Sequence, residues 1–169
     1  MKKLMVSLVL GLVLLLALGN AALAIPVTAP AGGSFTVFGD FGDWWGDPIA
    51  GIAYGITDSF AAGLELEIDG GPELAVFSQL TLEPFNFSAQ YFFTKSWLFV
   101  DGKYLIGLDP LTIGLGLSVF VDFIPTVNVD YGLKASLDLA VTDSISVYGN
   151  LSYWLIDGAH FEVGAGLTF

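Results

Sequence analysis

The fold is decided by residues 127–141, which read VNVDYGLKASLDLAV. Apolar residues stand at every second position of this stretch, and small, polar or charged residues stand between them. One face takes Val127, Val129, Tyr131, Leu133, Ala135, Leu137, Leu139 and Val141. The other face takes Asn128, Asp130, Gly132, Lys134, Ser136, Asp138 and Ala140. A period of two indicates a β-strand with one apolar face, and the stretch is long enough to cross a membrane when tilted.

The same period continues from residue 34 to the end of the chain. It predicts ten strands, near 34–41, 48–56, 60–68, 73–82, 85–93, 97–108, 111–122, 127–141, 145–156 and 160–169. Asp101-Gly102 is a sequence typical of a hairpin turn, but the alternation passes through it unbroken, so we expect one strand there. An unbroken strand also puts the similar turns at 56–60 and 141–145 at the same end of the sheet. The alternative is eight strands, with the weak first pair outside the barrel.

Charged residues occupy only one face of these strands, the less apolar one. Its acids are Asp40, Glu65, Glu67, Glu73, Asp101, Asp122, Asp130, Asp138 and Glu162, and its lysines are Lys103 and Lys134. The other face is uniformly apolar, and the chain is too short to supply a second layer that covers it. We therefore expect the apolar face to contact lipid. Because unpaired backbone groups are costly in hydrocarbon, the sheet must close into an all-β, antiparallel transmembrane β-barrel with short loops.

Composition excludes several classes of function. The 169 residues are 54% hydrophobic and 13% charged, with a mean hydropathy of +0.74 and a net charge of −12. So acidic a chain is repelled by phosphate backbones, which excludes nucleic acid as a partner. The chain has no cysteine and one histidine, His160, so disulfides, thiolate metal sites and multi-histidine centres are also excluded. We expect no cofactor and no metal site.

The first 24 residues are typical of a secretory signal peptide. Lys2 and Lys3 precede an apolar run, which ends in the small-x-small sequence Ala22-Leu23-Ala24. We expect cleavage after Ala24, although an uncleaved membrane helix is the competing interpretation. Residues 25–33, rich in proline and glycine, are expected to be a short unstructured lead before a barrel of residues 34–169.

The last strand carries a more specific motif. Glu162, Gly164, Leu167 and the terminal Phe169 form a pattern that resembles the C-terminal β-signal of bacterial outer-membrane barrel proteins, with Leu167 where an aromatic residue is common. The resemblance implies a small porin-like barrel in the outer membrane of a Gram-negative bacterium, and it implies that the barrel assembly machinery recognises these four residues. It also implies that the C-terminus lies on the periplasmic side.

The inner face suggests a function but does not fix one. Nine acids against two lysines favour small cations as partners, so the barrel is interpreted as structural or weakly cation-conducting. Inward aromatic residues would fill much of the lumen. Small inward residues argue against complete filling, because they would leave a narrow wet path: Gly51, Ala53, Gly55, Gly63, Gly114, Gly116, Ser118, Gly132, Gly164, Gly166 and Thr168.

Two other classes stay open as alternatives. A barrel enzyme acting on envelope lipid or peptide would use His160 and Glu162, with Ser152 or Asn150 on the neighbouring strand, although a salt-bridged pair is the plainer interpretation. A small binding or adhesion barrel would use Trp44 and Trp45, which are more simply interfacial aromatic anchors in a loop. The expected outer connections are very short, which argues against binding a large partner, and we predict no enzymatic activity.

Overall fold

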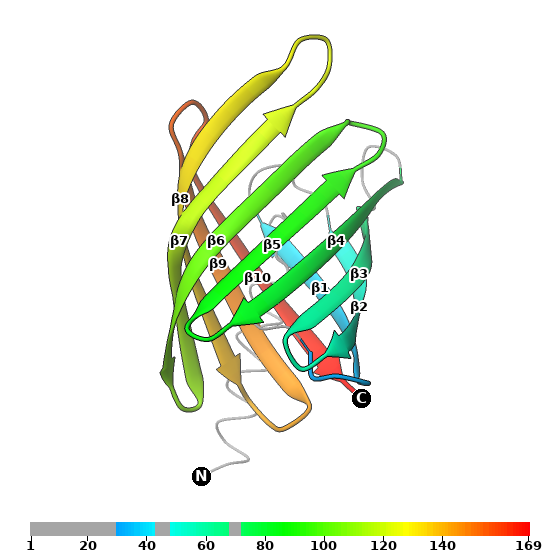
Figure 1. Cartoon of the computed structure of the whole chain (residues 1–169), viewed down its shortest axis with the longest axis vertical. Helices are drawn as coiled ribbons and strands as arrows, with labels where there is room; N and C mark the ends of the chain where they lie inside the picture. Colours follow the sequence, from blue (N-terminus) through cyan, green and yellow to red (C-terminus); the bar gives the residue numbers. More distant parts are fainter. Residues whose placement is uncertain (1–29, 43–47, 68–71) are drawn as a thin grey trace.

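The computed structural model describes residues 30–42, 48–67 and 72–169, and these form a closed barrel of ten antiparallel strands (Figure 1). The strands are β1 (Phe35–Gly42), β2 (Ile49–Thr57), β3 (Phe60–Glu67), β4 (Glu73–Leu82), β5 (Phe85–Phe92), β6 (Trp97–Leu108), β7 (Leu111–Asp122), β8 (Asn128–Ala140), β9 (Ile145–Trp154) and β10 (Gly158–Thr168). Each strand pairs with its neighbours in sequence, and β1 pairs with β10 to close the sheet. The predicted fold class is confirmed, and the strand number is ten rather than eight.

Strand β6 is continuous through Asp101 and Gly102. These two residues pair with Ser118 and Leu117 of β7 and with Ser88 and Phe87 of β5, so no turn interrupts the ladder. The unbroken strand was predicted from the alternation, and the structure confirms it.

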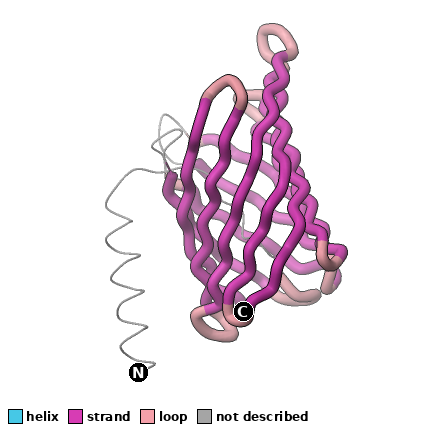
Figure 2. Tube along the Cα trace, turned by 90° about the vertical axis from the view of Figure 1, so that its left-hand side faces the viewer, coloured by secondary structure: helices cyan, strands magenta, loops and turns pink. Residues whose placement is uncertain are grey.

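The two ends of the barrel differ. The end that holds the C-terminus, called here the C-terminal end, also holds the turns that join β2 to β3, β4 to β5, β6 to β7 and β8 to β9 (Figure 1). Figure 2 shows the C-terminus beside loops at this end of the barrel. Two of these turns are built alike, as predicted: Thr57 Oγ1 accepts the Phe60 N–H at 3.0 Å, and Thr142 Oγ1 accepts the Ile145 N–H at 3.0 Å. At the far end, the connections 93–96, 123–127 and 155–157 are short, and the β7–β8 hairpin rises above its neighbours (Figure 1).

The outer surface of the barrel is apolar along its whole length. Within the described strands, no Asp, Glu, Lys or Arg faces outward, and large side chains such as Leu117, Leu133 and Tyr153 are more than half exposed. No helix among the described residues is long and apolar enough to cross a membrane. A closed sheet satisfies all of its own backbone groups, which is the condition for strands that are surrounded by hydrocarbon.

The start of the barrel differs from expectation. Residues 30–33 were expected to be unstructured, but they form a turn against β2 in which the Gly33 N–H donates to the Gly55 carbonyl at 2.7 Å. The Gly32 N–H donates to Asp58 Oδ1 at 3.1 Å. Gly55 allows this contact, because a Cβ there would lie 2.0 Å from the Ala31 oxygen. Residues 1–29, and with them the predicted cleavage after Ala24, lie outside the described residues.

Candidate functional site

The inner face carries the acids that the alternation assigned to it. Eight of the nine are buried: Asp40, Glu65, Glu67, Glu73, Asp101, Asp130, Asp138 and Glu162. The ninth, Asp122, is half-buried at the end of β7, where its Oδ1 accepts the Ile124 N–H at 2.9 Å and so caps the β7–β8 turn. Lys103 is buried, and Lys134 is half-buried.

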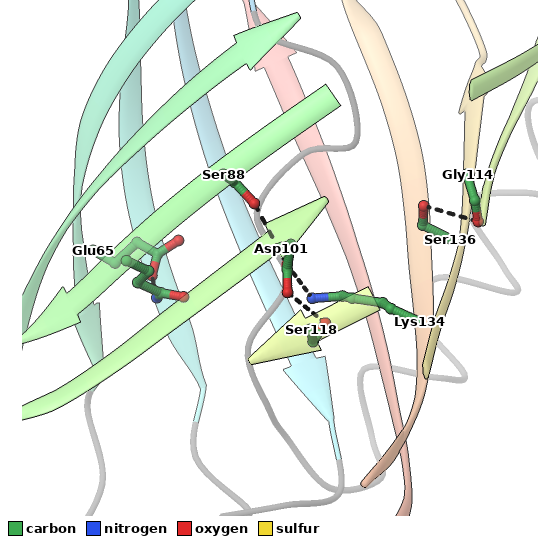
Figure 3. A network of polar contacts seen from close by, with 8 residues as sticks. Glu65, Ser88, Asp101, Gly114, Ser118, Lys134 and Ser136 are labelled. Carbon is green, nitrogen blue, oxygen red and sulfur yellow. Dashed lines mark hydrogen bonds and ion pairs between the residues drawn. The ribbon is translucent and has the colours of Figure 1, made fainter. Parts of the chain in front are cut away.

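Charged and amide side chains form a central polar layer, defined here as Asp40, Glu65, Gln90, Asp101, Lys103, Lys134 and Glu162. Its firmest contact is the ion pair between Lys134 Nζ and Asp101 Oδ2, at 2.9 Å (Figure 3). Ser118 and Ser88 donate hydrogen bonds to the two oxygens of the same Asp101 carboxylate, and Gln90 donates to Glu65. Asp101 therefore has three partners from three strands, which is the condition under which a charge is tolerated inside a protein.

Aromatic rings lie on both sides of the central polar layer. Towards the far end are Phe92, Trp97, Phe99, Phe120 and Trp154, whose ring centroids form a chain of contacts of 4.8–6.3 Å. Towards the C-terminal end, Phe38, Phe77 and Tyr148 cluster with Ala53 and Leu105. The order along β6 shows the layering: Phe99, Asp101, Lys103 and Leu105 succeed each other along its inward face. The two groups are called here the far and near aromatic layers.

Inward-facing glycines leave the space that these rings occupy. Four aromatic residues lie directly opposite a glycine on the adjacent strand: Phe38 opposite Gly51, Phe77 opposite Gly63, Tyr148 opposite Gly164 and Trp154 opposite Gly132. A Cβ on any of the four glycines would stand 2.2–2.9 Å from the facing ring. At these positions the expected wet path is therefore wrong, because the absent side chain leaves space that an aromatic ring occupies.

A lysine that the sequence analysis did not assign to the interior lies at the far end. Lys95 follows β5, and its Nζ lies 2.9 Å from Glu67 Oε1 and 2.7 Å from Glu73 Oε2. It also lies over the rings of Trp97 and Phe92, with Nζ 4.9 and 5.9 Å from their centroids. Partial burial disfavours the ammonium, but hydrogen bonds with Glu73 and Glu67 outweigh it and raise the pKa of Lys95. Lys95 thus ties the β5–β6 turn to β3 and β4.

Other polar interior residues were also missed. Gln79, Asn86, Ser88 and Gln90 are buried on the inner face of β4 and β5. Each lies an even number of residues from the inward acids or aromatic residues of its own strand, and this alternation places it on the same inner face.

Two cavities lie at the C-terminal end. One, of about 290 Å³, is lined by six serines and threonines, five apolar residues, Asp138 and Asp143. The other, of about 450 Å³, is lined by Asp58, Glu83, Leu105 and four further residues. Neither cavity is lined by Asp101, Lys103 or Lys134. Leu105 belongs to both the second cavity and the near aromatic layer, so that layer forms part of the cavity's floor.

The remaining predicted residues fall as follows. The register places His160 opposite Ser152 and Glu162 opposite Asn150. In the C-terminal motif, Glu162 is buried, Gly164 lies beneath Tyr148, and Leu167 and Phe169 are exposed. Trp44 and Trp45 lie outside the described residues. Among the residues the structure describes, no three His, Cys, Asp or Glu side chains converge closely enough to hold a metal ion.

The topology defines the class: a closed, ten-stranded, antiparallel β-barrel with an apolar exterior. No protein-family model matches the sequence, and no curated protein matches it. Among solved structures, the chain is similar to a KdgM porin, with 11% identity over 80% of this chain and 99% of that one, and a TM-score of 0.46. It is also similar to the N-terminal β-barrel domain of Pseudomonas aeruginosa OprF, with 14% identity, 83% and 100% coverage and a TM-score of 0.36. A third is Pseudomonas putida OprB at low pH, with 15% identity, 81% and 62% coverage and a TM-score of 0.37.

Proposed function

We propose that this chain spans the outer membrane of a Gram-negative bacterium as a porin-like barrel and passes small cations through a narrow, acidic lumen. The observation that carries the proposal is the division of charge: every charged side chain of the described strands lies on the inner face of a closed sheet. An apolar exterior suits hydrocarbon, and carboxylates along a pore attract cations and repel anions.

The two aromatic layers set the expected size of the pathway. Inward rings at both ends of the central polar layer leave no room for a wide aqueous channel, so we expect small conductance steps and no passage of large solutes. The described connections at the far end are too short to form a binding surface for a large partner.

We also propose how the chain is exported and assembled. We propose removal of residues 1–24 after Ala24, and recognition of Glu162, Gly164, Leu167 and Phe169 by the barrel assembly machinery. The position of Phe169 supports this role, because its N–H donates to the Phe35 carbonyl at 2.8 Å and the Phe35 N–H donates back at 3.2 Å. The C-terminal residue is thus part of the seam that closes the barrel.

We propose no enzymatic role for His160. The register brings it opposite Ser152, yet the far-end connections at 93–96, 123–127 and 155–157 are too short to build a substrate cleft around that pair.

The deciding experiment is planar-bilayer recording of the refolded mature chain under a salt gradient. We expect discrete, small steps whose reversal potential has the sign of cation preference. Asp130→Asn, which removes a buried inner-face acid near the far end, should weaken that preference, and Asp109→Asn, in an exposed turn that lines neither cavity, should not. Anion preference, or silence after verified insertion, would contradict the proposal.

A further inference from the structure

The central polar layer holds more negative than positive groups. Its carboxylates are Asp40, Glu65, Asp101 and Glu162, against Lys103 and Lys134. Lys134 is engaged directly by Asp101 at 2.9 Å, and Glu65 receives its hydrogen bond from the neutral Gln90. A carboxylate in a space bounded by aromatic rings stays ionised only where positive charge or hydrogen-bond donors stabilise it.

Asp40 and Glu162 lie close together around Gly164. Asp40 of β1 pairs with Gly164 of β10, and Glu162 is the preceding inward residue of the same β10. Asp40 is 0% and Glu162 is 6% exposed, so bulk water solvates neither carboxylate. Lys134 and Lys103 interact with Glu162 at longer range, and the buried Asn150 amide lies opposite Glu162 on β9.

Tyr148 adds an independent indication of a ligand at this place. Its ring covers Gly164 from β9, so that the ring carbon Cζ and the Asp40 Cβ lie 2.6 and 2.7 Å from the position a Gly164 Cβ would take. The residue is 1% exposed, and its hydroxyl has no hydrogen-bond partner among the described residues. The Tyr148 side chain therefore lies beside Asp40 next to Gly164, and its buried hydroxyl bonds none of the neighbouring carboxylates.

We propose that a monovalent cation, Na⁺ or K⁺, binds between Asp40, Tyr148 and Glu162, enclosed by the near and far aromatic layers. Carboxylate and phenol oxygens are hard ligands that suit such ions. Calcium fits less well, because it is usually held by more oxygen ligands and more carboxylates, and no three acidic side chains converge among the described residues. The inference rests on the proposed cation preference of the lumen and assigns its innermost binding site.

Thermal unfolding of the refolded chain in detergent micelles tests binding directly. The salt is NaCl, KCl or tetramethylammonium chloride at constant ionic strength, since tetramethylammonium is too large for a packed lumen. Each tenfold rise in Na⁺ or K⁺ above the dissociation constant should raise the midpoint by about 3–5 °C relative to tetramethylammonium. Equal midpoints in the three salts would overturn the proposal.

Variants locate the effect. Tyr148→Phe keeps the ring over Gly164 and removes the oxygen, and it should at least halve the ion-specific shift. Asp40→Asn should remove the shift, while Asp143→Asn, in an exposed turn, should keep it. Should Asp40→Asn fail to fold, Tyr148→Phe still decides the matter, because an undiminished shift in Tyr148→Phe contradicts a site at that hydroxyl.

Crystals grown in RbCl give a second, structural readout. We expect an anomalous peak between Asp40, Tyr148 and Glu162, and density for water alone at that place would refute the site. These measurements are separate from conductance. A barrel that is silent in bilayers but shows the ion-specific shift and the peak retains the site and loses the proposed transport role. A cation-preferring barrel with neither retains transport and loses the site.

Discussion

The pairing of rings with glycines predicts that one added methyl group will destabilise the barrel. Gly51 of β2 faces Phe38 of β1, and the three atoms nearest to an added Cβ are all in the Phe38 ring, at 2.2, 2.5 and 2.8 Å. Ordinary contact begins at 3.4 Å, so the ring would have to retreat by about 1.2 Å. Phe38 is 2% exposed and packs edge-on against Phe77 with centroids 5.7 Å apart, so retreat requires repacking of the near aromatic layer.

The expected cost of Gly51→Ala follows from two opposed effects. Forcing atoms into a packed interior costs about 1–3 kcal/mol. Alanine is intrinsically better than glycine inside a strand by roughly 0.5–1 kcal/mol, which offsets part of that cost. We therefore expect a net loss of about 0.5–2 kcal/mol in the free energy of unfolding. In a Phe38→Ala background the clash is absent, so the same change should stabilise the barrel by roughly 0.5–1 kcal/mol.

Urea unfolding of the refolded barrel in lipid vesicles, followed by tryptophan fluorescence, measures these differences. The matched control is Gly107→Ala in β6, where an added Cβ meets nothing within 4 Å and no loss is expected. The sign reversal between the two backgrounds is the decisive quantity. If Gly51→Ala does not change the free energy of unfolding in the native background, or lowers it as much without Phe38 as with it, the packing of the Phe38 ring does not require a glycine at position 51.

Three further predictions concern the other interior contacts. Lys134→Met should lower the free energy of unfolding by about 3–5 kcal/mol in the same urea assay, because the buried Asp101 carboxylate loses its ion-pair partner. Adding Asp101→Asn to Lys134→Met should recover much of this loss. Folding raises the pKa of Lys95 above 10.5. The protonated lysine therefore contributes its full stabilisation of the fold below pH 10.5, and this contribution is lost as the pH rises through the pKa of the folded state. The difference in free energy of unfolding between wild type and Lys95→Met should accordingly shrink only above about pH 10.5. Phe99→Ala should increase single-channel conductance by opening the far aromatic layer, whereas Phe87→Ala, on the lipid-facing surface, should not.

The sequence predicts the strands well because one physical rule acts along the whole chain. A strand with lipid outside and polar groups inside must alternate, and any slip of one residue would place a charge such as Lys103 or Asp130 in hydrocarbon. This rule sets the ten strands, the continuity through Asp101-Gly102, and the burial of eight of the nine inner-face acids. Strand ends are less constrained, and Asp122 accordingly emerges half-buried as the cap of a turn.

Contacts inside the barrel were harder to predict, because they depend on register between strands. Gly51 and Phe38 lie 13 residues apart, and only the pairing of β1 with β2 places one opposite the other. The same is true of Lys95, which reaches Glu67 across 28 residues because the sheet brings the ends of β3, β4 and β5 together. Residues 30–33 carry no alternation at all, and their order comes from the backbone space that Gly55 leaves.

The layered interior explains why ten strands need not give an open pore. A barrel gains interior width with each added strand, and that width must be filled by side chains or by water. Here glycines on one strand allow rings from the next to lie flat across the space, so the added width holds aromatic layers above and below the charges. The charges at the centre are then shielded from both ends, and the proposed passage of ions requires a ring to move. Conduction in this barrel should therefore be limited by side-chain motion rather than by the acids, and Phe99→Ala should raise the rate of ion flow more than it alters cation preference.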